Sequence, residues 1–258
     1  MRTLLVDGDI SIYQVAAAAE VATDWGNGLW TLHSDEYEAK FKLDEVFSRY
    51  KEVLEADKMI VALSDTRNFR YDVYPDYKHN RIGKRPPLLR QYLKEYVIDN
   101  YDTYLRPNLE GDDVLGILAT STVIIPKGEK IIVSEDKDMK TIPGLICNFK
   151  KYEEEGIKSI SPEEARYWHM YQTLTGDIAD GYKGCPSCGP KTAEKILGED
   201  PSEWTYETMW QKVVETYEKK GLTEADALQI ARIARICQKE DYNYKERKVI
   251  LWTPPSLK

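Results

Sequence analysis

Three short apolar runs, at residues 3–6, 59–63 and 130–134, are separated by segments with a helical pattern. Each run has an uninterrupted apolar centre, at 4–6, 59–63 and 131–133, which is typical of a strand buried on both faces of a parallel sheet. In the segment 43–56 the apolar residues recur at spacings of three and four, as in an amphipathic helix. This alternation predicts an α/β fold with a mostly parallel central sheet flanked by helices. Further helices are expected at 10–21, 86–96, 162–174, 206–219 and 224–237, and further strands at 103–105 and 249–252.

Carboxylates stand where the predicted strands end, with Asp7, Asp65 and Asp136 following the three runs. In such sheets ligands bind at the carboxyl ends of the strands, so these acids are expected to share one rim. Other acids open the apolar segment 109–116 or stand between glycines at 176–181. The candidate metal ligands are Asp7, Asp65, Glu110, Asp112, Asp113, Asp136, Asp138, Asp177 and Asp180.

Crowded carboxylates repel one another, by about 4 kcal/mol for two charges roughly 4 Å apart at an effective dielectric of about 20. For the segment 109–116 taken alone, the alternative to metal binding is that its acids simply stabilise the start of a helix by offsetting the helix dipole. Hard oxygen ligands without a histidine pattern favour Mg²⁺ or Mn²⁺, and their number suits two ions, an arrangement that cleaves phosphodiesters. Asp113→Asn is therefore expected to abolish activity while preserving or raising thermal stability without metal.

The chain has 258 residues, a length that predicts one domain, 1–258. It contains no apolar run long enough to span a bilayer and opens directly into a strand without a signal peptide, so we expect a soluble, cytoplasmic monomer without membrane association. Four cysteines are too few for a secreted disulfide scaffold. Cys185 and Cys188 lack a second Cys or His pair at zinc-ligand spacing and are interpreted as small core residues.

The net charge of −8 argues at first against nucleic acid, but the charges are unevenly distributed. Residues 66–94 contain eight bases and two acids, a local net charge of +6. Within them, 68–81 mixes tyrosines with bases, and aromatic faces stack on unpaired bases while Lys and Arg hold phosphates. The alternative is a solvated loop whose tyrosines only pack. A basic strip facing an acidic pocket suits a substrate with a phosphate backbone.

A Gly/Pro-rich turn at 184–190 precedes a short helical segment, and backbone N–H groups at such a helix start can grip a phosphate. Lys191 adds charge there. Upstream, Ser161 and Glu164 form a capping box with proline at the first helical position, which predicts a helix from Pro162 to about Leu174.

These motifs, taken in chain order, resemble the bacteriophage 5′-to-3′ exonucleases of the flap-endonuclease-like superfamily, especially those of short-tailed phages. The resemblance covers nearly the whole chain. It rests on Val6-Asp7-Gly8, Phe69-Arg70, Tyr77-Lys78-His79-Asn80-Arg81, Leu109-Glu110-Gly111-Asp112-Asp113, Ser134-Glu135-Asp136-Lys137-Asp138, Gly176-Asp177 to Leu197, and Val249-Ile250-Leu251-Trp252.

The resemblance implies a helical arch at about 66–100 and a helix-hairpin-helix DNA-binding motif at about 175–198. It places Lys78 and Arg81 at the scissile phosphate as catalytic residues, and Tyr77 near the terminal base. Asp138, Asp177 and Asp180 would surround a second metal, with the other acids around the first. The DNA-binding residues would be Arg70, Tyr77, Lys84, Arg85, Gly184, Gly189, Lys191, Thr192 and Lys195.

The implied activity is metal-dependent hydrolysis from the 5′ ends of duplex DNA, nicks or flaps, with flap endonuclease and RNA-primer removal as related activities. The implied cofactors are two Mg²⁺ ions, replaceable by Mn²⁺, and a K⁺ ion at the hairpin. The implied location is the host cell cytoplasm. Ser187 departs from the family's usual glycine, and no role is assigned to Asp9 or Glu135. The alternatives are a phosphatase with an aspartate nucleophile and a non-catalytic branched-DNA binding protein.

Overall fold

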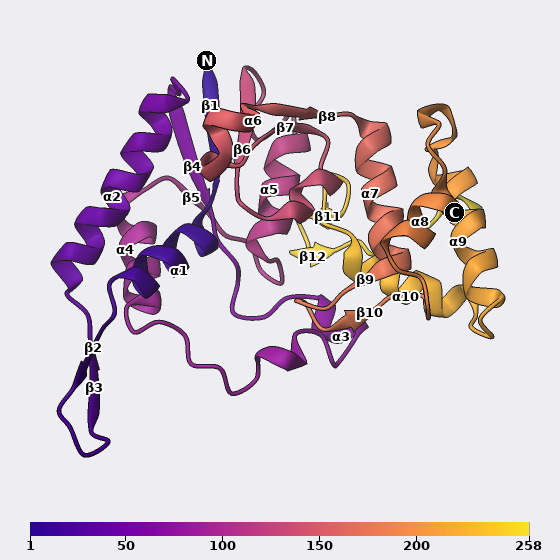
Figure 1. The fold of residues 1–258 in the computed structure, drawn as a ribbon. Coiled ribbons are helices and arrows are strands. Elements are labelled where there is room, and N and C mark those ends of the chain that lie inside the picture. The colour runs from indigo at the N-terminus through magenta and orange to yellow at the C-terminus, as the bar shows by residue number, and fades with distance from the viewer. Residues whose placement is uncertain (258) are drawn as a thin grey trace.

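The computed structural model describes residues 1–257, which are built around a six-stranded sheet with the order β5-β4-β1-β6-β7-β8 (Figure 1). All neighbouring strands pair in parallel except β8, which is antiparallel to β7. The strands are β1 (Arg2–Asp7), β4 (Lys58–Ala62), β5 (Thr103–Tyr104), β6 (Glu129–Val133), β7 (Gly144–Cys147) and β8 (Lys158–Ile160). The mostly parallel sheet expected from the sequence is confirmed.

The register of the central strands aligns their carboxyl ends. Val6 of β1 pairs with Val61 of β4 on one side and with Val133 of β6 on the other. The residues that follow these three valines therefore emerge at the same edge of the sheet. This alignment creates the rim on which the acids were expected.

The continuous apolar runs are explained by cover on both faces of the sheet. Leu4 and Val6 pack into a core with helices α1, α2 and α4, whereas Leu5 packs on the other face against α5. The helices are α1 (Gly8–Ala18), α2 (Glu36–Val53), α3 (Arg70–Val73), α4 (Arg90–Asn100), α5 (Gly111–Thr120) and α6 (Tyr152–Glu155). None of the helices in residues 1–257 combines the length and apolar character that crossing a membrane requires.

A second group of helices forms the end of the molecule coloured orange to yellow in Figure 1. It consists of α7 (Pro162–Thr175), α8 (Pro190–Leu197), α9 (Tyr206–Glu218) and α10 (Glu224–Ala234). These helices share an apolar core of their own around Met170, Trp210 and Trp252. The capping box predicted for α7 is present, because Glu164 N donates to Ser161 Oγ at 3.1 Å and Ser161 N donates to Glu164 Oε2 at 2.8 Å.

Several short elements differ from the sequence-based expectation. The strand expected at 249–252 is limited to β12 (Lys248–Val249), which pairs with β11 (Tyr242–Asn243) outside the main sheet. An exposed hairpin, β2 (Val21–Asp24) with β3 (Trp30–His33), projects from the body in Figure 1. The remaining two-stranded ribbon pairs β9 (Gly176–Asp177) with β10 (Tyr182–Lys183).

The segment 66–100, expected to form a helical arch, is helical only in parts. It contains α3, one 3₁₀ turn at His79–Arg81, and α4, which begins at Arg90 instead of the expected Pro86. Between the 3₁₀ turn and α4 the chain is largely irregular. Gly83 adopts a φ of +80°, and the Pro86-Pro87 pair lacks two backbone donors, so a continuous helix cannot form there.

Candidate active site

Asp7 ends β1 and lies almost fully buried at the rim. Its carboxylate accepts hydrogen bonds from Ile10 N at 3.1 Å and from Ser134 Oγ at 2.8 Å. Burial, together with the charges of Asp9 and Asp136, raises the pKa of Asp7 to about 7 despite these two hydrogen bonds. A carboxylate that resists ionisation in this way is stabilised by a nearby cation.

Three further carboxyls have raised pKa values for the same two reasons. Burial and then the charges of Asp7, Asp136 and Glu110 raise the pKa of Asp112, at the start of α5, well above its usual range. Burial and neighbouring acids also raise the pKa of Asp136, which follows β6, and raise that of Asp138 to about 7. We call Asp7, Asp112, Asp136 and Asp138 the acid cluster.

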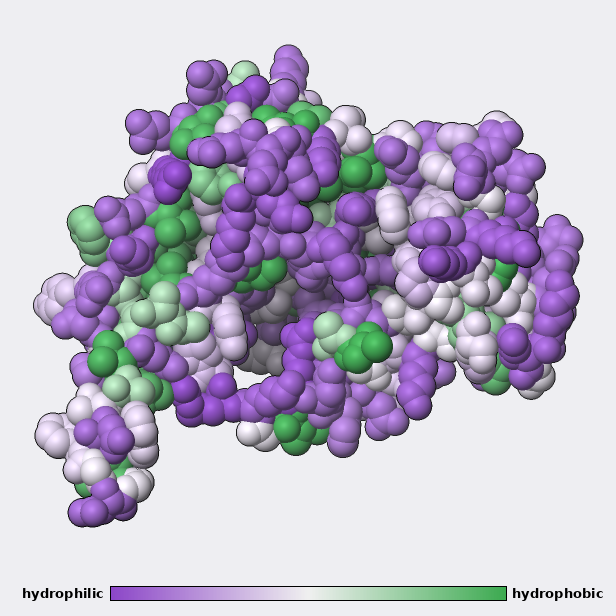
Figure 2. Space-filling model, in the orientation of Figure 1, coloured by the Kyte–Doolittle hydropathy of each residue, from purple (hydrophilic) through white to green (hydrophobic). Residues whose placement is uncertain are grey.

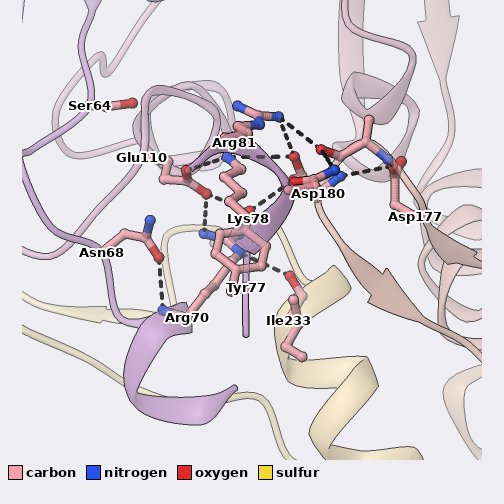
Figure 3. Close-up of polar contacts among 12 residues, drawn as sticks. Ser64, Asn68, Arg70, Tyr77, Lys78, Arg81, Glu110, Asp177, Asp180 and Ile233 are labelled. Carbon is pink, nitrogen blue, oxygen red and sulfur yellow. Dashed lines mark hydrogen bonds and ion pairs between the residues drawn. The ribbon is translucent and has the colours of Figure 1, made fainter. Parts of the chain in front are cut away.

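Glu110 and Asp180, beside the acid cluster, are instead paired with bases (Figure 3). Lys78 Nζ lies 2.5 Å from Glu110 Oε1 and 3.7 Å from Asp180 Oδ1. Arg81 Nη2 lies 2.5 Å from Asp180 Oδ1. The structure thus brings both predicted catalytic bases to two of the predicted metal ligands.

Asn80 holds this arrangement together, a role that sequence reasoning did not assign. Its Nδ2 donates to Ile178 O at 2.9 Å and to Ala179 O at 3.2 Å, while Lys78 N donates to Asp180 O at 2.8 Å. Ser134 and Lys137 were also missed. Lys137 Nζ lies 3.0 Å from Asp177 Oδ2, and although burial opposes it, this base keeps the pKa of Asp177 below its usual value. The sequence did offer a signal for Ser134 and Lys137, because both stand close to Asp136 in the motif 134–138.

Tyr77 is too deeply buried to stack on a DNA base. Its side chain is 2% exposed and packs between Tyr71 and Tyr182. The phenol oxygen is 2.8 Å from both Glu110 Oε2 and Asp180 Oδ2. The prediction of base stacking by Tyr77 is therefore corrected, because the ring has no free face. Its hydroxyl positions the two carboxylates instead.

Arg70 and Asp113 form a buried pair, which corrects both assignments. Arg70 Nη1 donates to Asp113 Oδ2 at 2.7 Å, and Nη2 donates to Asp113 Oδ1 at 2.8 Å. The remaining acceptor capacity of Asp113 is used by Cys237 N and Glu110 N, each at 3.0 Å. Arg70 also donates to Ile233 O and Arg235 O. With every donor used inside the protein, Arg70 cannot contact DNA, and Asp113 has no oxygen free for a metal.

Asp65 also has a structural role, since its carboxylate oxygens accept hydrogen bonds from Thr66 N at 2.7 Å and from Asn108 N at 2.9 Å. These bonds join the loop after β4 to the segment before α5. Metal ligation by Asp65 remains a prediction. Of the two unassigned acids, Asp9 accepts from Ser64 N at 2.8 Å, and Glu135 pairs with Lys150 at 2.8 Å.

The predicted DNA-binding hairpin is a turn between β10 and α8. Lys191, Thr192 and Lys195 are exposed on α8, and Gly189 is exposed at its N-cap. Gly184 is required by packing, because a Cβ there would lie 2.3 Å from Leu174 O. DNA contact by these residues stays a prediction.

Cys185 and Cys188 are buried free thiols in the apolar core of the α7–α10 group, as expected.

Ser187 adopts a φ of +59°, so the turn keeps its left-handed conformation without glycine. Because an L side chain is strained there, Ser187→Gly is expected to raise the free energy of unfolding by about 0.5–1 kcal/mol. Urea denaturation measures this change. Ser48→Gly, at an exposed position inside α2, is the control and should lower stability. A loss of stability in Ser187→Gly would contradict the strain.

The basic strip borders a hollow in the face shown in Figure 2, whose surface there is largely hydrophilic. Lys84 is exposed and lies in the irregular stretch between the 3₁₀ turn and α4. Arg85 is anchored, since its Nη1 and Nη2 lie 2.7 and 2.8 Å from the two oxygens of Glu20. This pair ties the strip to the end of α1, and DNA contact by Lys84 and Arg85 stays a prediction.

The donor set fits divalent cations, although no three His, Cys, Asp or Glu side chains within residues 1–257 converge tightly enough to hold an ion as they stand. The four carboxyls of the acid cluster have no Lys or Arg within 4.0 Å in this part of the chain. Their raised pKa values reflect burial and mutual repulsion, which a bound cation would relieve. Carboxylate oxygens are the ligands that hard ions such as Mg²⁺ prefer.

Comparisons with known proteins agree on one family. The family described as "5′-3′ exonuclease, N-terminal resolvase-like domain" matches residues 2–164. The chain is 31% identical to an exodeoxyribonuclease of Enterobacteria phage T3, covering 98% of this chain and 93% of that protein. It is 30% identical to an exonuclease of Escherichia phage T7, covering 97% and 93%.

Among solved structures, the fold is similar to a bacteriophage T5 flap endonuclease in a complex with DNA and metal ions. That likeness has a TM-score of 0.64 at 14% identity and covers 91% of this chain and 89% of the other. A T5 5′-exonuclease with bound divalent metal ions gives a TM-score of 0.62 at 14% identity, with the same coverage.

Proposed function

This chain belongs to the 5′-3′ exonuclease family and is a 5′-3′ nuclease that acts on DNA, and from that premise we propose that it hydrolyses duplex DNA from 5′ ends, nicks or flaps. The observation that carries the proposal is the acid cluster at the sheet edge, with Lys78 and Arg81 beside it. RNA-primer removal belongs to the same proposal. We also propose that residues 1–258 form a single nuclease domain and that the protein acts as a monomer.

We propose two Mg²⁺ ions as cofactors, replaceable by Mn²⁺. By the family resemblance, the first ion would be held by Asp7, Asp65, Glu110, Asp112 and Asp136, and the second by Asp138, Asp177 and Asp180. The raised pKa values of Asp112 and Asp138 support a cation beside each group. When bound, such ions supply Lewis acidity and offset charge on the phosphodiester. A K⁺ ion at the turn 184–189 is proposed on the resemblance alone.

The chain's own residues orient the phosphate and offset its charge. Lys78 Nζ and Arg81 lie at the edge of the acid cluster, so both can turn from carboxylate oxygens to phosphate oxygens of a strand entering the hollow. Charge that develops on those oxygens in an in-line displacement is then stabilised by two cationic groups. Tyr77 keeps Glu110 and Asp180 in place during this exchange.

Lys191 and Lys195 on α8 would hold the duplex backbone on the far side of the acids from the basic strip, which is how polarity would arise. The two alternatives lose support. A phosphatase with an aspartate nucleophile would give no role to the acids between Glu110 and Asp113 or to the basic strip at 66–94. A non-catalytic binding protein would have no use for four mutually repelling acids that are fully or partly buried.

The test is the release of label from linear duplexes labelled at the 5′ or the 3′ end, in Mg²⁺, beside closed and nicked circles. We expect small early products from the 5′ label, no cutting of relaxed closed circles, and cutting once a nick is present. Chelation should stop all cleavage. Efficient cutting of closed circles, or small early products from the 3′ label alone, would contradict the proposed polarity.

Lys78→Ala provides the variant for the same assay. It should slow single-turnover cleavage on the order of 10²-fold, because a group that stabilises transition-state charge acts on the chemical step. Lys42→Ala, at an exposed position on α2 outside the basic strip, is the matched control and should keep the single-turnover rate within a few-fold. Equal rates for wild type and Lys78→Ala would remove Lys78 from the site.

A further inference from the structure

A cavity of about 500 Å³ opens where the chain leaves β5 and meets the β11–β12 hairpin. This volume falls within the range of about 300–1,000 Å³ typical of small-ligand sites. The hairpin is fixed on the segment after β5, because the Tyr242 hydroxyl donates to Pro107 O at 3.3 Å and its ring joins the core beside α5. The lining residues are Leu105, Arg106, Pro107, Tyr242, Tyr244 and Arg247, none of which belongs to the acid cluster.

Two guanidinium groups line this cavity without an acidic partner. Arg106 lies 3.7 Å above the centre of the Tyr104 ring, and its Nη1 donates to Leu105 O at 2.8 Å. Arg247 is exposed on the hairpin. Within residues 1–257, neither guanidinium has a carboxylate oxygen closer than 4.0 Å. Two such arginines on one concave surface favour an anion with several oxygens, and planar guanidinium groups match phosphate in particular.

Two tyrosine rings line the cavity beside the arginines. Tyr242 and Tyr244 meet edge to face, with ring centres 5.1 Å apart. Tyr242 is buried and serves as a wall, whereas Tyr244 remains 43% exposed. An accessible tyrosine beside two arginines provides a stacking surface for a base next to contacts for a phosphate.

We propose that this cavity binds one unpaired nucleotide, with Arg106 and Arg247 on its phosphate and Tyr244 against its base. The ligand is either a free 5′-mononucleotide or a nucleotide in an unpaired DNA strand, and the chemistry is the same in both cases. The segment that lines the cavity continues from Pro107 through Leu109 directly into Glu110. The site is thus a second nucleotide site on the nuclease proposed above, separated from the first along the chain by only Asn108 and Leu109.

Binding is measured in the full-length protein with chelator present, so that no cleavage occurs and a failure of the proposed activity does not affect the result. The probes for calorimetry are thymidine 5′-monophosphate, thymidine, and a 5′-phosphorylated thymidine tetranucleotide. We expect the phosphate-bearing probe to bind at least about tenfold more tightly than thymidine, since charged hydrogen bonds carry the affinity. A mononucleotide that binds as well as the tetranucleotide identifies free nucleotide as the ligand, and a clear preference for the tetranucleotide identifies a strand.

Arg247→Ala and Tyr244→Ala, both at exposed positions, should each weaken binding about tenfold or more. Arg49→Ala, an exposed arginine on α2, is the matched control and should leave it unchanged. Photo-crosslinking with 5-iodo-2′-deoxyuridine monophosphate, followed by peptide mapping, gives an independent location and should modify a peptide containing Tyr244. Equal affinity for thymidine and its monophosphate, unchanged binding by Arg247→Ala, or crosslinks that map elsewhere would overturn the proposal.

Discussion

Asp112→Asn is expected to reduce cleavage on the order of 10²–10³-fold in Mg²⁺ while leaving the metal-free protein as stable as wild type or more stable. The loss of cleavage follows from the removal of a charged metal ligand that offsets transition-state charge. The stability result follows from the raised pKa of Asp112, because the ionised form is disfavoured by burial and by Asp7 and Asp136. Single-turnover cleavage and thermal melting in chelator measure the two effects.

The stability effect should depend on pH in a definite direction. A carboxyl whose pKa is raised on folding binds its proton more tightly in the folded state, so its ionisation costs stability as pH rises above the ordinary aspartate value. Asp112→Asn removes that cost, and its advantage over wild type should shrink as pH is lowered. Asp99→Asn, at an exposed position on α4, should match wild type throughout. A clear destabilisation by Asp112→Asn in chelator at neutral pH would refute the assignment.

Asp113→Asn is expected to have the opposite effect and to destabilise the protein by about 3 kcal/mol or more, because it removes the bidentate counter-charge of the buried Arg70 guanidinium and leaves only Glu110, at 3.2 Å. This reverses the sequence-based expectation of preserved or increased stability. Burial opposes ionisation of Asp113, but Arg70 and two backbone donors hold its pKa below the usual value. Its stabilisation is therefore present above the ordinary aspartate pKa and is lost as pH falls through the lowered value.

Urea denaturation at neutral pH measures this loss, and Asp112→Asn, one residue earlier, is the matched control. A double-mutant cycle with Arg70→Gln should give a coupling free energy of about 1–3 kcal/mol, as for two residues in one hydrogen-bonded network. Additive effects, or a stable Asp113→Asn protein, would show that the pair is not required for folding.

The sequence by itself predicted the sheet, because continuous apolar runs are needed where helices cover both faces. It also predicted the rim of acids, since parallel strands end at one edge, Asp7 ends β1, and Asp136 stands three residues after the end of β6. The helix α7 followed from its capping box. In each case the pattern is local, and physical rules for strands and helix ends apply to it without knowledge of distant residues.

Tertiary structure alone decided which acids are free to bind an ion. Asp112 and Asp113 are adjacent and chemically identical, but successive residues on a helix point about 100° apart. One therefore lies among other carboxyls at the rim, while the other meets Arg70, 43 residues away in sequence. Tyr77 is likewise buried by Tyr182 and bonded to Asp180, over a hundred residues further along. Burial and pairing depend on which remote side chain fills the neighbouring space, and no local pattern encodes that.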